Sequence, residues 1–185
     1  MRRGWRARRD GGVLSLGGYR DGLGAAVRAA KFGGAMRLLD VLGAALGEAL
    51  ADAVPTAADG TVPWLVPVPS HPRRRAVRGE DPSLRLARAM LGRAGGGDRR
   101  FEVVQALTRR AGAAPQSTLS TARRETNVAG AFLVVPRFRA RLATRPVVLV
   151  DDVLTTGATA RAAAAALRDA GAVVRLVAVV AVADA

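Results

Sequence analysis

Two adjacent carboxylates and a turn rich in hydroxyl groups stand next to each other in the segment VVLVDDVLTTGAT, residues 147–159. The four apolar residues that open it are typical of a strand buried on both faces of a parallel sheet. Asp151 and Asp152 follow directly, so we expect them at the carboxyl end of that strand, where open α/β sheets bind their ligands. Their oxygens can accept hydrogen bonds from sugar hydroxyls or join the shell of a metal ion.

Residues 155–159, which follow the acid pair after Val153 and Leu154, suit a phosphate group. They form a short turn into an Ala-rich helix expected over residues 157–170, and they are Thr155, Thr156, Gly157, Ala158 and Thr159. The first turn of a helix offers backbone N–H groups and a positive dipole end to an anion. A glycine at this place lets the backbone approach a ligand that a Cβ atom would obstruct. An acid pair beside a phosphate cradle predicts a phosphorylated sugar as the ligand.

The elements around this segment predict an α/β fold. Apolar residues at helical spacing indicate two helices between residues 19 and 53, broken at Gly33-Gly34, and a further helix over 83–93. Short apolar runs indicate strands over 62–68, 101–107, 131–135, 146–150 and 173–182. Such alternation is typical of an open, doubly wound, mostly parallel sheet of about five strands. We expect one domain over residues 19–185, with helices in 19–60 and a core in 61–185, preceded by a disordered basic arm over residues 1–18.

Composition excludes several classes of protein. The chain has 185 residues, no cysteine and one histidine, which excludes a disulfide framework and leaves few ligands for zinc, so no protein-held metal site is expected. No apolar run approaches the about 20 residues of a membrane span. The basic start has no apolar segment behind it, unlike a secretory signal. We therefore expect a cytoplasmic protein without membrane association.

The net charge of +14 is compatible with nucleic acid or phosphate-rich ligands. However, 28 of the 29 basic residues are arginine and isoleucine is absent, a bias that GC-rich codons favour. We therefore expect part of the arginine excess to reflect this bias and to lie on solvated surfaces. The charge alone does not identify DNA as a ligand.

Segment 147–159 resembles, at each of its thirteen positions, the phosphoribosyl-pyrophosphate (PRPP) binding signature of type I phosphoribosyltransferases. From about Tyr19 to Val182 the chain is also similar to the ComF family of these proteins. The residues that carry this second resemblance are Tyr19, Lys31-Phe32-Gly33, Val66-Pro67-Val68-Pro69-Ser70, Arg78-Gly79, Pro115-Gln116, Leu119, Arg123, Asn127-Val128 and Ala131-Phe132.

The resemblance implies a role for each matching residue. Asp151 and Asp152 would hold the ribose 2′- and 3′-hydroxyls, and residues 155–159 would bind the 5′-phosphate. The pyrophosphate group would meet Pro69, Ser70, Arg73 and Arg78, in a loop whose arginines suit bidentate oxyanion binding. A flexible loop with Gln116, Arg123 and Arg124 would close over PRPP. Lys31 would belong to an N-terminal helical hood that selects the acceptor.

The implied activity is that of a glycosyltransferase, a phosphoribosyltransferase in which an acceptor displaces pyrophosphate from PRPP. Mg²⁺ would be carried by PRPP. The sequence identifies neither the acceptor nor a general base. The alternative is a ComF-type competence protein, associated with DNA uptake, that uses the PRPP site as a sensor or binds DNA through its basic surface. The chain lacks the cysteine-rich zinc ribbon found in many ComF-like proteins. A homodimer is the default expectation for the assembly.

Overall fold

The computed structural model describes residues 8–54, 59–72, 75–76, 79–92, 100–110 and 130–183. The helices are a short turn η1 (Tyr19–Leu23), α1 (Gly24–Phe32), α2 (Leu38–Ala53), α4 (Pro82–Met90), η3 (Pro136–Phe138), α6 (Arg139–Leu142) and α7 (Ala158–Asp169). The strands are β1 (Arg8–Asp10), β2 (Val13–Gly18), β3 (Trp64–Pro67), β4 (Glu102–Val103), β5 (Leu107–Arg109), β6 (Phe132–Val134), β7 (Pro146–Leu154) and β8 (Val173–Val182).

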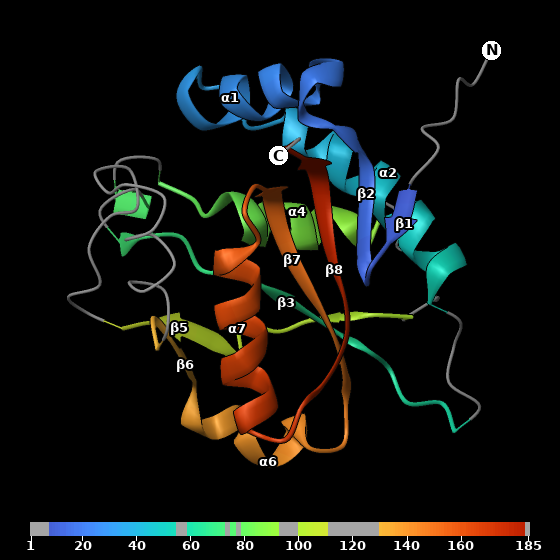
Figure 1. Ribbon diagram of the computed structural model, residues 1–185, viewed down its shortest axis with the longest axis vertical. Coiled ribbons are helices and arrows are strands. Elements are labelled where there is room, and N and C mark those ends of the chain that lie inside the picture. The colour runs from blue at the N-terminus through green and yellow to red at the C-terminus, as the bar shows by residue number, and fades with distance from the viewer. Residues whose placement is uncertain are drawn as a thin grey trace.

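A six-stranded sheet in the order β1-β2-β8-β7-β3-β4 forms the centre of the molecule. Its five strands from β2 to β4 run parallel, and β1 pairs antiparallel with β2 at one edge. Helices α2 and α4 lie behind the sheet and α7 in front of it, while α1 lies over the carboxyl ends of β7 and β8 (Figure 1). The expected α/β fold with a mostly parallel sheet is confirmed in this coarse form. Within the described residues, no helix is long and apolar enough to cross a membrane.

The two faces of the sheet have separate apolar cores. Alternate residues of β7 supply both, because Val148 and Val150 pack with α1, α2 and α4, whereas Val147 and Leu149 pack with α7. All four side chains are fully buried. A strand covered on both faces must be apolar at every position, which explains its continuous run of valine and leucine.

Three sequence-based expectations about the strands are wrong. Residues 8–18 form β1 and β2 instead of a disordered arm, because the short apolar run around Leu14 and Leu16 is buried beside β8. The single strand expected over 101–107 is divided between β4, in the large sheet, and β5. Strand β5 pairs with β6 in a separate two-stranded sheet, so the 131–135 strand also lies outside the main sheet, which has six strands where about five were expected.

Helices α2 and α4 pack closely on one another near the C-terminal end of α4. Gly43 and Gly47, one turn apart on α2, face Ala89 and Met90 of α4. A Cβ atom at Gly47 would collide with the Met90 carbonyl oxygen, so the approach of the two backbones depends on glycine there. At its other end α4 begins with Asp81 as N-cap and Pro82 in the first turn, a combination that favours a helix start.

Candidate functional site

The acid pair lies at the carboxyl end of β7, at the centre of the sheet. Strand β7 continues through both acids to Leu154, four residues beyond the expected end at residue 150, and Asp151 pairs in register with Val179 of β8. Asp152 is 8% exposed, and Asp151 is partly buried. Oδ1 of Asp151 accepts two hydrogen bonds, from the Asp152 backbone N–H at 2.8 Å and from the Ser83 hydroxyl at 3.0 Å.

The pKa of Asp151 is raised to about 7, first by burial and then by the neighbouring charge of Asp152, while the Asp152 N–H, Lys31 and Ser83 limit the rise. Two adjacent carboxylates at a buried strand end repel one another, so a cationic partner or a ligand that donates hydrogen bonds stabilises their ionised forms. The pair is therefore suited to bind a group with several hydroxyl donors.

Lys31 supplies such a cation from the end of α1. Its Nζ lies 2.6 Å from Oδ2 of Asp152. The side chains of Lys31 and Asp152 are 22% and 11% exposed, so this ion pair is screened less by water than a surface pair. Lys31 is the only lysine in the chain and joins the N-terminal helices to the acid pair.

The turn after β7 leads directly into the N-terminus of α7. Gly157 has a φ of +73°, a left-handed conformation that side chains other than glycine rarely adopt, and α7 begins at the next residue. Arg161 donates through Nη1 to the Thr156 carbonyl oxygen at 2.8 Å, which brings a guanidinium next to the turn. Thr155 and Thr156 are exposed. A helix N-terminus with an arginine beside it attracts negatively charged groups.

A cavity of about 260 Å³ connects these parts. Lys31, Asp151, Asp152, Thr155 and Thr159 line it together with Pro69 and Ser70 from the loop after β3. His71, Ser83 and Arg109 contribute further polar groups to its wall. The structure thus brings together residues that lie more than a hundred positions apart in the sequence.

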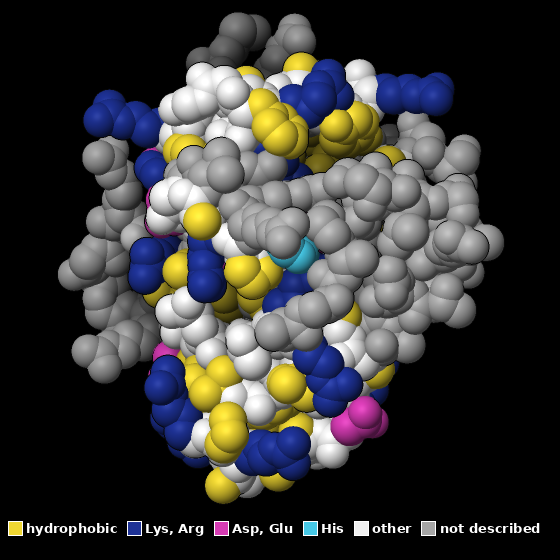
Figure 2. Space-filling model, turned by 90° about the vertical axis from the view of Figure 1, so that its left-hand side faces the viewer, with side chains coloured by type: hydrophobic (Ala, Val, Ile, Leu, Met, Phe, Trp, Pro, Cys, Tyr) yellow, Lys and Arg dark blue, Asp and Glu magenta, His cyan; other side chains and the backbone are white. Residues whose placement is uncertain are grey.

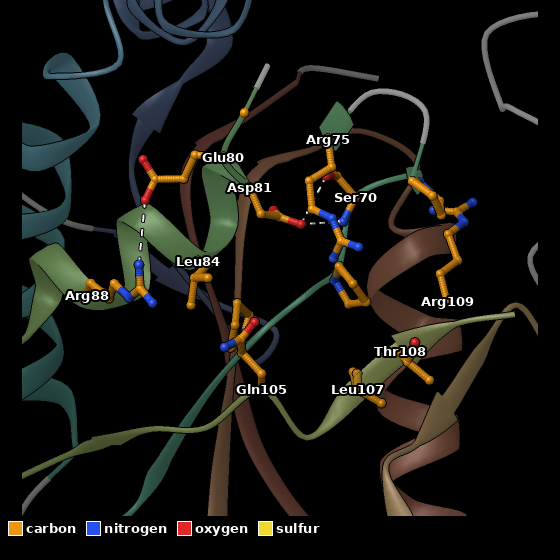
Figure 3. Close-up of a pocket in the computed structure, with 14 residues that line it drawn as sticks. Ser70, Arg75, Glu80, Asp81, Leu84, Arg88, Gln105, Leu107, Thr108 and Arg109 are labelled. Atoms are coloured by element: carbon orange, nitrogen blue, oxygen red, sulfur yellow. Dashed lines mark hydrogen bonds and ion pairs between the residues drawn. The ribbon is translucent and has the colours of Figure 1, made fainter. Parts of the chain in front are cut away.

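A second cavity, of about 500 Å³, adjoins the first and shares Pro69, Ser70 and Arg109 with it. Figure 3 shows Arg75 beside Ser70 at one end of this cavity and Arg88 of α4 at the other, with Arg109 on the β5 side. Glu80 is already engaged by Arg88 at 3.6 Å and by Arg85 at 3.0 Å. Three arginines, Arg75, Arg88 and Arg109, thus line the cavity next to the acid-lined one, and Arg88 is paired with Glu80.

Five of the residues expected in the site lie outside the described residues: Arg73, Arg78, Gln116, Arg123 and Arg124. The other expected residues are all described. Gly157 and Ala158 form the start of α7, Thr156 binds Arg161, and the remaining seven line the first cavity.

The sequence did not single out Asp81, Ser83 or Arg109. The order Asp-Pro-Ser at 81–83 does signal a helix start. Nothing in the sequence indicated that Ser83 reaches an acid 68 positions further along the chain. Within the described residues, no three histidine, cysteine or acidic side chains gather as a metal site. No known family model matches the chain, and a search of curated proteins finds no match either.

Proposed function

We propose that this protein binds PRPP and acts as a type I phosphoribosyltransferase, related to the ComF family, on an acceptor still to be identified. The observation that carries the proposal is the convergence, around one cavity, of the Asp151–Asp152 pair, the turn at Gly157 and the Ser70 loop. PRPP carries a diol, a phosphate and a diphosphate. The acid pair can accept hydrogen bonds from the diol, the turn at Gly157 suits the phosphate, and the Ser70 loop suits the diphosphate.

In the proposed complex the ribose lies over the end of β7. Its 2′- and 3′-hydroxyls donate to Asp151, which is partly buried, and to Asp152, which is buried, and hydrogen bonds to an ionised carboxylate are strong. The 5′-phosphate occupies the turn at Thr155–Thr159, against the N-terminus of α7. The diphosphate points across Ser70 toward the arginine-lined cavity, where Arg75 and Arg109 neutralise its charge.

The reaction needs positioning and electrostatics more than covalent help. The acceptor forms a bond to C1 of the ribose as the bond from C1 to pyrophosphate breaks, and the sugar gains positive charge in between. Mg²⁺ enters as part of the PRPP complex and neutralises the diphosphate. The carboxylates of Asp151 and Asp152 orient the ring and favour positive charge on it, and the arginines stabilise the departing pyrophosphate.

On the face drawn in Figure 2, the described basic side chains do not form one continuous stripe. Figure 2 shows lysine and arginine side chains in several separate groups on that face of the molecule, with apolar and uncharged side chains between them. A continuous basic stripe is the pattern that tracks a nucleic-acid backbone.

Calorimetric titrations with Mg-PRPP, with ribose 5-phosphate and with pyrophosphate test binding of the whole ligand and of each of its two parts. We expect one PRPP to bind per chain, and each of the two smaller ligands to compete with it while binding at least about tenfold more weakly, because each fills only part of the site. Binding of pyrophosphate that leaves PRPP affinity unchanged would contradict the proposed arrangement.

A further inference from the structure

The first turn of α4 lies between the two cavities and touches both ligand-facing segments. Asp81 accepts hydrogen bonds at Oδ2 from the Ser70 backbone N–H at 2.8 Å and from the Ser70 hydroxyl at 2.9 Å. Its other oxygen, Oδ1, accepts from the Ser83 backbone N–H at 3.2 Å. Figure 3 shows Asp81 directed at Ser70 from the α4 side of the arginine-lined cavity. Both oxygens of this carboxylate are thus used inside the protein.

Ser83 continues the connection to the acid pair. Its hydroxyl donates to Oδ1 of Asp151 at 3.0 Å, the oxygen that also accepts the Asp152 N–H. Two donors on one oxygen hold the carboxylate of Asp151 in one orientation, which fixes the position of its second oxygen. Asp81 and Ser83 are 7% and 3% exposed, so water competes little for these bonds.

We propose that Ser83 is the positioning residue of Asp151 and that Asp81, by holding Ser70 and Ser83 together, sets the distance between the acid pair and the pyrophosphate loop. The inference rests on the proposed function, because the distance between the acid pair and the pyrophosphate loop affects binding only if one ligand contacts both. A continuous series of hydrogen bonds thus links Ser70 in the loop after β3, Asp81 and Ser83 at the start of α4, and Asp151 in β7.

The electrostatic surroundings of Asp151 make this role measurable. Asp152 faces it from the same strand, Lys31 from α1 and Ser83 from α4, while His71 and Arg109 line the same cavity. Ser83 carries no ionisable group, so its removal leaves the net charge unaltered. The Ser83 hydrogen bond lowers the pKa of Asp151 against the effect of burial. Loss of the hydroxyl therefore raises that pKa, which a purely structural serine would not do.

The test compares Ser83→Ala with the parent chain by two measurements. The first is a carbon-13 NMR titration of the Asp151 carboxyl without ligand, and the second is Mg-PRPP affinity as a function of pH. We expect the Asp151 midpoint to rise by about half to one unit and PRPP to bind about five- to tenfold more weakly at pH 7. The loss shrinks toward pH 9, where Asp151 is ionised in both chains.

Two further variants control for packing. Ser15→Ala removes another buried serine, in β2 away from the cavities, and we expect it to change neither readout. Ser83→Thr keeps the hydroxyl and is expected to retain most of the affinity. If Ser83→Ala does not fold, Asp81→Asn takes its place, since an amide cannot accept the same three hydrogen bonds, and weaker PRPP binding is again expected.

The outcomes separate this inference from the proposed function. An unmoved Asp151 midpoint together with parent-like PRPP affinity in folded Ser83→Ala would overturn the positioning role. A parent chain that binds no PRPP would overturn the proposed function, and with it the ligand-spanning role of Asp81. The midpoint shift would then still establish the effect of Ser83 on Asp151.

Discussion

Lys31 Nζ lies 2.6 Å from Oδ2 of Asp152, and this ion pair joins helix α1 to the carboxyl end of β7. The two residues lie 121 positions apart in the chain. The contact places a cation next to the carboxylates proposed to hold the ribose. Because it lies mostly away from water, removing one partner would leave the charge of the other buried without compensation.

Removing the cation should therefore destabilise the fold. We expect Lys31→Met to lower the free energy of unfolding at pH 8 by about 1–3 kcal/mol, because the charge of Asp152 stays buried without its partner. Urea unfolding at pH 8 measures this loss. Arg28→Met, which removes an exposed charge from the same helix, is the matched control, and an equal loss in that variant would contradict the role of the ion pair.

The raised pKa of Asp151 predicts how stability depends on pH. The folded-state pKa is about 7 and the value in an unfolded chain is near 4, so the folded state binds the proton more tightly. The stability that this group contributes is fully present below pH about 4 and is lost as the pH rises to about 7. The free energy of unfolding of the parent relative to Asp151→Asn should thus fall by roughly 2–4 kcal/mol between pH 4 and 8.

The control for this measurement is Asp169→Asn, an exposed acid at the end of α7. It should follow the parent at every pH. A difference between the parent and Asp151→Asn that stays constant from pH 4 to 8 would show that Asp151 titrates normally.

Gly157 and Gly171 provide a pair of variants that separates backbone strain from ligand binding. Both have positive φ, +73° and +87°, at opposite ends of α7. Replacing either by alanine should cost about 1 kcal/mol of stability. Only Gly157→Ala should also weaken Mg-PRPP binding, by about tenfold or more, because its Cβ narrows the phosphate turn and meets Arg161 Nη1 at 3.0 Å. Equal PRPP affinity in the two variants would remove the turn from the proposed site.

The α2–α4 contact predicts a stability effect remote from the ligand. Gly47→Ala places a methyl group against the Met90 backbone, and we expect it to lower the free energy of unfolding by about 1–3 kcal/mol, as overpacking does. Glu48→Ala, at the adjacent exposed position, should change stability little. Melting temperatures of the two variants check this, and a neutral Gly47→Ala would mean that the helices can move apart freely.

Local signals in the sequence were enough for the centre of the fold. The run from Pro146 to Val150 and the Ala-rich segment after Gly157 predicted β7 and α7, because a doubly buried strand and a helix start have clear patterns. The strand β2 was missed because its apolar residues are few and flanked by glycines, and only pairing with β8 makes them a strand. Tertiary pairing of this kind leaves little trace in local composition.

The candidate site, like the fold, was predictable from the sequence only in part. Asp151, Asp152 and the turn at Gly157 follow one another in the chain, so their proximity could be inferred from the strand–turn–helix pattern. The contact of Lys31 with Asp152 and the hydrogen bonds of Asp81 and Ser83 depend on how α1 and α4 pack on the sheet. Such long-range contacts are set by the packing of whole elements, which periodicity does not specify.

The central claim is that the acid pair binds PRPP, and thermal unfolding with and without Mg-PRPP tests it most directly. At a hundredfold excess over Kd a bound ligand adds about 2.7 kcal/mol, which raises the melting temperature of a chain this size by roughly 5–10 °C. The account predicts this rise in the parent and its loss in the folded Asp151→Asn/Asp152→Asn variant. An unchanged melting temperature in the parent, or an equal rise in the double variant, would contradict it.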